Sequence, residues 1–264
     1  GASAMPRVDP FSDIARYYDA IMEHVNYERW GMTCRNLGAL LETPFIHVDA
    51  GCGTGVLIRR LRKDGWHSMG FDLSFAMLQT GKQTWPGLPL AVGDLCAPPF
   101  YGSVGLVTCL FDSINFLLDE AAVRTCIQCF ADMLDEHGIV YFDIVTERMV
   151  TEHFENQTWV EDSGGFTTTW SNTYDHRNAI ADTELRINHG VPSLIRERIF
   201  PTALFEDAVA EAGLHMLGVF NGNDWRAPTR RSTRIDFIAA KQSSRRLQRD
   251  FERTAAKVRH MMKR

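Results

Sequence analysis

The feature that most constrains the fold of this chain is a regular alternation of strand-like and helix-like segments over residues 45–145. Five short apolar segments have the length and composition of strands, namely residues 45–50, 67–74, 88–94, 104–111 and 139–145. The sequence between them has mainly helical spacing. Because strands joined through helices run in the same direction within one sheet, the alternation predicts a doubly wound α/β fold.

The sequence on either side of this alternation predicts how the fold is completed. Residues 11–41 place apolar side chains at helical spacing, which predicts two helices before the first strand. Residues 154–200 are rich in Thr and aromatic residues and contain the turn signals "SGG" and "DHRN", which is typical of antiparallel hairpins. A helix over residues 201–214 and strands at 215–220 and 234–240 complete a mostly parallel sheet of seven strands.

These segments define the expected organisation of the chain. We divide it into a tag-like, disordered N-terminus (1–8), an α/β core (9–150), an antiparallel β insertion over the active site (151–200), the completion of the core sheet (201–241) and a basic amphipathic C-terminal helix (242–264).

Charge is distributed unevenly between the last of these parts and the others. Residues 241–264 carry nine Lys and Arg against two Asp and Glu, so the tail has a charge of +7 and residues 1–240 have a charge of −12. An acidic body argues against a nucleic-acid partner and favours neutral or cationic substrates. We expect the tail helix to dock on its own body or on a second subunit of a homodimer; binding to an anionic membrane or to RNA is the alternative. Its apolar stripe consists of Leu247, Phe251, Thr254, Val258 and Met261.

The sequence also indicates a cellular setting. No segment approaches the roughly 18 consecutive apolar residues of a membrane span, and the N-terminus lacks the basic and apolar regions of a signal peptide. The six cysteines form no disulfide framework, and Cys126 and Cys129 make a lone C-x-x-C that is better explained as buried helix residues than as a metal or redox site. We therefore expect a cytoplasmic protein without a membrane partner.

A glycine-rich turn follows the first strand in "HVDAGCGTG". Its glycines, Gly51, Gly53 and Gly55, form G-x-G-x-G, whereas a dinucleotide fingerprint requires its third glycine at position 56, which is Val56. A pyrophosphate at a helix N-terminus needs donors rather than acids. Because Asp49 precedes the first glycine, the turn favours a ligand with an ammonium or sulfonium group.

Acidic residues recur at the ends of the next two strands. Asp72 lies 23 residues after Asp49, where a carboxylate can accept both hydroxyls of a ribose. Asp94 lies 22 residues further on, where it can accept from an adenine amine while Leu95 packs on the ring. Either residue alone is equally explained as a helix cap. Three acids along one edge of a parallel sheet, together with the glycine turn, indicate a nucleoside-containing cofactor.

The segments "VDAGCGTG", "GFDLSFAML", "VGDL" and "CLFDSINFLL" resemble the successive motifs of class I S-adenosylmethionine-dependent methyltransferases of the small-molecule branch. The resemblance covers roughly residues 11–145 and resumes at "RERIFPTALFEDAVAEAGL". It implies a Rossmann-like doubly wound, seven-stranded, mostly parallel sheet with an inserted antiparallel β lobe. It also implies S-adenosyl-L-methionine as cofactor, S-adenosyl-L-homocysteine as product, and no metal.

The resemblance also implies a set of cofactor-binding residues. The methionine half of the cofactor is expected to lie against Asp49, Gly51, Cys52, Gly53 and Gly55. The ribose, adenine and methyl group are expected to lie against Asp72, Leu73, Met77, Asp94, Leu95 and Phe111. On the N-terminal helices, Tyr17 or Tyr18 resembles the aromatic position that closes over the cofactor, and Tyr27 and Trp30 are further candidates; we assign Tyr18 and Trp30 to the cofactor and Tyr17 to the substrate. Buried aromatic residues of an amphipathic helix would give the same pattern.

Two residues are candidates for catalysis. Asp112 follows the fourth strand, whose carboxyl end adjoins the ligand crevice of a doubly wound sheet, and His153 follows the fifth strand. Methyl transfer from a sulfonium requires alignment and exclusion of water, an amine acceptor must be neutral, and a hydroxyl or carbon acid needs a base. Nucleic-acid amino methyltransferases of this fold carry Asp/Asn-Pro-Pro-aromatic where this chain reads "FDSI", so base flipping is not supported.

Substrate choice is expected to lie in the insertion. In "FTTTWSNTY", alternation places Trp170 and Tyr174 on one face with Phe166, which either covers a substrate or packs on the core. Arg196 and Arg198 share a face of "SLIRERIF" and are candidates for binding an anionic group.

The sequence thus predicts methyl transfer to a small-molecule acceptor by in-line displacement, with N, O and C acceptors all open. Two alternatives remain: a non-catalytic module that binds S-adenosylmethionine, and a methyltransferase that holds RNA or protein through the basic tail.

Overall fold

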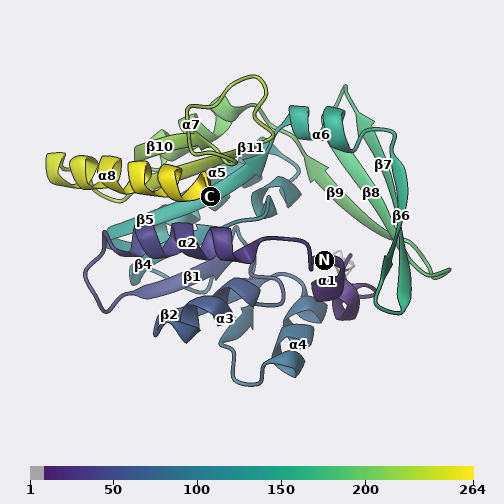
Figure 1. Ribbon diagram of the computed structural model, residues 1–264. Helices are drawn as coiled ribbons and strands as arrows, with labels where there is room; N and C mark the ends of the chain where they lie inside the picture. The colour runs from purple at the N-terminus through teal and green to yellow at the C-terminus, as the bar shows by residue number, and fades with distance from the viewer. Residues whose placement is uncertain (1–8) are drawn as a thin grey trace, which may run out of the picture.

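The computed structural model describes residues 9–264; the tag-like segment expected at residues 1–8 lies outside this range. At its centre is a seven-stranded sheet with the order β10-β11-β5-β4-β1-β2-β3 (Figure 1). The strands are β1 (Ile46–Ala50), β2 (His67–Asp72), β3 (Leu90–Val92), β4 (Val104–Cys109), β5 (Leu134–Val145), β10 (His215–Asn221) and β11 (Arg234–Ala240). Strands β1 to β5 pair in parallel, and β11 runs antiparallel to both of its neighbours. The expected doubly wound, mostly parallel sheet is confirmed.

Helices cover both faces of this sheet. Helices α2 (Tyr27–Gly38), α3 (Val56–Lys63) and α8 (Arg245–Met262) pack together on one face, while α5 (Glu120–Met133) and α7 (Thr202–Glu211) pack on the other. This is the arrangement that right-handed crossovers produce when the winding direction reverses between β1 and β4. The reversal leaves a crevice at the carboxyl ends of these two strands.

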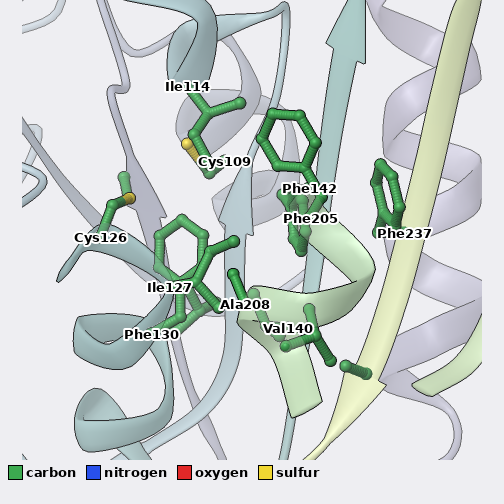
Figure 2. Packing of buried hydrophobic residues seen from close by; sticks show 14 of the residues in the cluster. Cys109, Ile114, Cys126, Ile127, Phe130, Val140, Phe142, Phe205, Ala208 and Phe237 are labelled. Atoms are coloured by element: carbon green, nitrogen blue, oxygen red, sulfur yellow. The ribbon is translucent and has the colours of Figure 1, made fainter. Parts of the chain in front are cut away.

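Aromatic side chains form much of the core on the α5 and α7 side. Figure 2 shows Phe142 of β5 beside Phe205 of α7 and Phe237 of β11. The rings of Phe142 and Phe237 stack with their centroids 4.8 Å apart, and all three residues are fully buried. Burial of aromatic side chains on this scale fixes the register of β5 and β11, whose last residues carry parts of the site described below.

The expected start of the fifth strand is wrong. The strand was expected at residues 139–145, but α5 ends at Met133 and β5 begins at Leu134. The cause is tertiary: Leu134 is buried and pairs with Val104 of β4, so the sheet rather than helical propensity decides the conformation. A short helix that was not expected, α6 (Glu147–His153), follows β5.

Residues after α6 form the expected antiparallel lobe. Its four strands, β6 (Thr158–Ser163), β7 (Phe166–Asp175), β8 (Ile180–Ile187) and β9 (Ser193–Arg198), pair in sequence order beside the main sheet (Figure 1). In this register Tyr174 lies opposite Ala181, which lies opposite Glu197, so these three side chains share one face.

Helix α1 (Ala15–Ile21) connects the lobe to the core. Ile14 and Ile21 pack with Leu185 of the lobe, and the helix also contacts α4 (Phe75–Thr84), which follows β2. The short helix therefore lies between the lobe and the carboxyl end of the main sheet.

The C-terminal helix α8 docks on the body of its own chain. Phe251 and Val258 are buried, and the Phe251 ring stacks on Phe220 of β10. Arg259 Nε donates to the carbonyl oxygen of Trp225 at 2.8 Å. In the expected stripe, Met261 is instead partly exposed. None of the helices within residues 9–264 has both the length and the apolar composition to cross a membrane.

Candidate active site

The glycine turn is held in place by backbone hydrogen bonds to β2. Gly51, Gly53 and Gly55 all have positive φ, at 76°, 57° and 83°, a conformation that side chains with a Cβ rarely adopt. The amides of Gly51 and Cys52 both donate to the carbonyl oxygen of Phe71, at 2.8 and 3.0 Å. The sequence therefore places glycine wherever the chain must turn back towards the end of β2.

Asp72 lies at that end and receives two backbone donors. The Gly53 amide donates to its Oδ2 at 2.9 Å, and the Ser74 amide donates to its Oδ1 at 2.8 Å. Burial raises the pKa of this carboxyl group, while the two amide donors oppose the rise. Asp72 thus couples the glycine turn to the start of α4, and each of its oxygens can accept a further hydrogen bond.

Asp49 lies at one end of a buried series of hydrogen-bonded side chains beneath the turn. Thr108 Oγ1 donates to Asp49 Oδ1 at 2.7 Å and lies 2.8 Å from His47 Nε2, and His47 Nδ1 lies 2.8 Å from Ser68 Oγ. Because Thr108 donates to Asp49, it accepts from the Nε2–H of His47, whose Nδ1 then accepts from Ser68. Burial lowers the pKa of His47 to about 3, so the ring is neutral, and raises that of Asp49 to about 7.

Aromatic residues of the N-terminal helices face these acids. Burial raises the pKa of the Tyr18 hydroxyl, and the charges of Asp112 and Asp72 add to the rise. Burial, with smaller contributions from nearby Asp19 and Asp49, raises the pKa of Tyr27 to about 12. Asp19 also accepts a hydrogen bond of 2.6 Å from Thr54 in the glycine turn.

The end of β4 is a strained turn held by a buried carboxylate. Phe111 and Asp112 both have positive φ, at 57° and 53°, which is costly for residues other than glycine. Their amides donate to the fully buried carboxylate of Asp143 on β5, at 3.0 and 2.6 Å. The Phe111 ring packs between Tyr27 and Trp30, with centroid distances of 5.0 and 4.6 Å.

Arg234 of β11 forms ion pairs with the carboxyl groups of Asp112 and Asp143. Its guanidinium donates to Asp143 Oδ1 at 3.0 Å and to Asp112 Oδ1 at 3.2 Å. The two carboxylates raise the pKa of Arg234. Two negative charges and one positive charge therefore hold the strained turn in a fixed position.

A cavity of about 110 Å³ lies between this turn and the lobe. It is lined from the core side by Asp112, Val145, Arg234 and α6, and from the lobe by β7, β8 and β9, including Asn172, Thr183 and Glu197. Glu197 Oε2 is closed off from solvent and accepts no hydrogen bond from residues 9–264. Burial and the adjacent carboxyl group of Asp112 raise the pKa of Glu197. The cavity thus brings together two carboxyl groups that no sequence motif links.

The residues expected around adenine lie at the ends of β2 and β3. Met77 is buried, and its Cε lies 3.3 Å from where a Cβ on Gly53 would lie. Leu73 is largely exposed, while Leu95 packs against the core on the α5 side. Asp94 Oδ1 accepts from the Cys96 amide at 2.8 Å.

The residues expected to bind substrate are spread over the lobe and α1. Tyr17 packs on Phe166 with ring centroids 4.7 Å apart, in an apolar cluster that includes Trp170. Tyr174 is buried, and its hydroxyl donates to Glu147 at 2.6 Å.

The arginine pair does not reach a shared anion site. Arg196 is exposed and makes two hydrogen bonds to Asp182, and Arg198 donates to the carbonyl oxygen of Leu118 at 2.8 Å. His153 is exposed beside Glu152 and is not part of the cavity lining.

Sequence reasoning missed Asp143, Arg234 and Glu197. Period-two alternation carried a usable signal for Glu197, because residue 197 must face opposite to both 196 and 198 on β9. Asp143 and Arg234 carry no local signal, because they lie inside apolar strands and meet Asp112 only through the pairing of β5 with β4 and β11.

The acidic side chains at this end of the sheet suit a cationic nucleoside cofactor. Asp49 lies beneath the glycine turn, Asp72 accepts from its Gly53 amide, and Asp72 and Asp112 both contribute to the raised pKa of Tyr18. Within residues 9–264 no group of His, Cys, Asp and Glu side chains has the arrangement of a metal site. The fold and the acidic turn place the protein in the Rossmann-like class, with a turn suited to a cationic nucleoside ligand.

Comparison with known proteins agrees with this definition. Residues 48–138 match the sequence model of the methyltransferase domain family. Over 247 residues the chain is 24% identical to a Geobacillus sp. (strain WCH70) protein whose name places it among the methyltransferases, covering 88% of this chain and 99% of the relative.

Two solved structures share the fold. An S-adenosylmethionine-dependent methyltransferase from Clostridium acetobutylicum aligns with a TM-score of 0.75 at 20% identity, covering 87% of this chain and 98% of that protein. An amino pentose methyltransferase from Micromonospora echinaspora, solved with S-adenosylmethionine bound, aligns with a TM-score of 0.67 at 18% identity, covering 92% and 100%. Residues 48–138 of this chain therefore form a methyltransferase domain, in a fold shared with S-adenosylmethionine-dependent methyltransferases.

Proposed function

We propose that this enzyme transfers the methyl group of S-adenosylmethionine to a small molecule held in the cavity between the lobe and the main sheet. The observation that carries the proposal is the position of Asp112. Its carboxyl group lines the lobe cavity, and the neighbouring Phe111 ring packs between Tyr27 and Trp30 of the N-terminal helix α2. The strained turn after β4 would thus lie between the methyl donor and the acceptor, as an in-line transfer between two ligands requires.

The cofactor compartment is assigned to residues around the glycine turn. Asp72 would accept the ribose hydroxyls, since its two oxygens are already oriented by the Gly53 and Ser74 amides. Asp49 would attract the positive charge of the methionine half from beneath the turn. Tyr18, Trp30 and Phe111 would cover the opposite side and exclude water. When bound, the cofactor supplies a methyl group on a sulfonium, whose C–S bonding electrons remain on sulfur as the acceptor forms its bond.

The size of the cavity supports a small acceptor. A space of about 110 Å³ that is walled by the lobe on one side and α6 on the other admits the reacting end of a metabolite and no folded polymer. The Micromonospora echinaspora protein that shares this fold is an amino pentose methyltransferase, which supports a small acceptor here.

Calorimetric titration with S-adenosylmethionine tests the cofactor assignment. We expect Asp72→Ala to weaken binding by at least tenfold, because each hydrogen bond to a charged group contributes about 1.5–3 kcal/mol. Asp207→Ala, which removes an exposed carboxylate from α7, is the matched control and should bind as the wild type does. Equal affinity in the two variants would rule out the ribose assignment.

Incubation with methyl-labelled S-adenosylmethionine and a fractionated cell extract tests the acceptor class. We expect the label in compounds that pass a filter retaining macromolecules. Label confined to retained RNA or protein would contradict the proposal and favour the macromolecular alternative.

A further inference from the structure

Glu197 is the one acidic side chain that the lobe directs at Asp112. It lies opposite Ala181 on β9, on the same face as Tyr174, and this face lines the cavity. Its neighbours Arg196 and Arg198 are engaged elsewhere, with Asp182 and with the Leu118 carbonyl. Alternation along β9 therefore places the carboxyl group of Glu197 on the cavity wall and turns Arg196 and Arg198 away from it.

The charges around Glu197 leave the cavity acidic. The carboxyl groups of Asp112 and Asp143 face it from the β4 turn and from β5, and Arg234 of β11 faces it as the counter-charge. That guanidinium is already bonded to both aspartates, at 3.2 and 3.0 Å. Asp182, also in the lining, pairs with Arg196 on the lobe. If all the carboxyl groups of the cavity were ionised, the single positive charge of Arg234 would therefore not neutralise them.

The carboxyl groups of Glu197 and Asp112 lie within hydrogen-bond reach of each other. Two carboxylates repel at this range, so the pair holds one proton, which burial and this repulsion place on Glu197 by raising its pKa. Oε2 of Glu197 remains buried without a donor from residues 9–264. A buried acceptor without a donor destabilises the site, and a ligand with N–H groups removes that cost.

We propose that Asp112 and Glu197 bind the acceptor and that the acceptor is a small cationic amine, whose ammonium group replaces the proton that the two carboxyl groups share. The inference rests on the proposed function, since it assumes that the cavity is the acceptor site. An ammonium group supplies three N–H donors and a positive charge, which match two carboxylates and the free Oε2 atom. An alcohol supplies one donor and no charge, and an anionic acceptor would be repelled.

The pair also prepares the amine for transfer. On binding, the shared proton leaves to water and the ammonium nitrogen lies between two carboxylates. One N–H proton then moves to Glu197, while Asp112 keeps its ion pair with Arg234. The freed nitrogen lone pair forms the bond to the methyl carbon as the C–S bond breaks, with its electrons left on sulfur. The product is an N-methylammonium ion, and the pair again holds one proton.

Labelled S-adenosylmethionine and a metabolite extract separated by cation exchange test the acceptor. We expect the labelled product to arise from the fraction retained as cations, with the label on nitrogen by mass spectrometry. Label only from neutral or anionic compounds overturns the inference and leaves the proposed function standing. Calorimetric binding of S-adenosylmethionine without a labelled product from any fraction overturns the inference too. Absence of S-adenosylmethionine binding refutes the proposed function itself.

Glu197→Gln tests the role of the pair with the amine so identified. Gln keeps the size of Glu and can donate to Asp112, but it cannot take a proton. We expect kcat/KM to fall at least about 100-fold, and the rise of kcat/KM with pH, which reflects release of the shared proton, to be lost. Binding of S-adenosylmethionine should change less than twofold. Glu184→Gln, at an exposed position on β8, is the matched control and should behave as wild type. An unchanged kcat/KM and pH profile in Glu197→Gln overturns the inference.

Discussion

Replacing Thr108 with Val tests the buried polar chain beneath the glycine turn. Val has almost the same shape, but it lacks the hydroxyl that donates to Asp49 at 2.7 Å and lies 2.8 Å from His47 Nε2. The substitution leaves two buried polar atoms without partners, and each costs about 1–3 kcal/mol. We therefore expect the free energy of unfolding to fall by about 2–6 kcal/mol, measured by urea denaturation.

The same substitution should change how cofactor affinity depends on pH. Burial raises the pKa of Asp49 to about 7, and the hydrogen bond from Thr108 opposes that rise. Since the ionised carboxylate attracts the cationic cofactor, calorimetry on the wild type should show affinity for S-adenosylmethionine increasing as the pH rises through 7. In Thr108→Val the pKa of Asp49 rises further, so the increase moves to higher pH.

Stability should show the opposite pH dependence. The folded protein holds the Asp49 proton more tightly than the unfolded chain does. The resulting contribution to stability is complete below the unfolded pKa of about 4 and is lost as the pH rises through about 7. Thr33→Val is the control: Thr33 is also buried, but its hydroxyl donates only to the carbonyl oxygen of Arg29 within α2. If both variants lose the same stability and neither shifts the pH dependence of binding, the buried hydrogen bonds of Thr108 with Asp49 and His47 have no role beyond packing.

Three further outcomes are expected. Asp143→Asn should lower the free energy of unfolding by about 3–5 kcal/mol in urea denaturation and weaken methyl transfer, because it breaks a buried ion pair and leaves one of two strained amides without its acceptor; an unchanged midpoint would contradict this account. Gly81→Ala should lower the melting temperature, since a Cβ there would lie 2.3 Å from a backbone oxygen of the glycine turn, whereas Gly31→Ala, which meets only a flexible arginine, should not. The double variant Arg246→Ala/Arg253→Ala removes two exposed charges of α8 and should leave kcat/KM for a small acceptor unchanged; a large loss would favour the macromolecular alternative.

The structure also changes the design of that last experiment. From sequence, removal of residues 242–264 is the natural way to test the tail. Because Phe251 and Val258 are buried against the body, deletion would expose core surface and destabilise the whole chain. Substituting exposed arginines separates the charge of the helix from its packing.

The fold could be predicted because its signals are local. Each strand from β1 to β4 is a short apolar run, and the helices between them begin and end at recognisable residues, such as Ser74, which caps α4 through a hydrogen bond to Met77. The residues assigned to the cofactor are predicted from the same signals, since parallel strands bring their carboxyl ends to one edge of the sheet. The start of β5 could not be predicted, because Leu134 is extended only through pairing with Val104.

The residues that line the cavity were harder to predict from the sequence, because they come from distant segments of the chain. Asp112, Glu197 and Arg234 come from a strand end, the lobe and the last strand of the sheet, and only the tertiary fold brings them together. Two arginines flanking Glu197 drew attention to an anion site, although strand alternation turns them away from the residue between them. In a lobe built of hairpins, the pleat therefore predicts which side chains face the cavity better than charge composition does.

The placement of Tyr17 and Tyr18 on one short helix has a kinetic consequence. Tyr17 packs on the lobe, while Tyr18 faces the acids of the glycine turn. Helix α1 has seven residues and no side-chain cap at its start, so it cannot persist without these contacts. We predict that transient unfolding of α1 admits S-adenosylmethionine and that its refolding over the bound cofactor restores the contact with the lobe. The two substrates should therefore bind in a compulsory order, with the acceptor second.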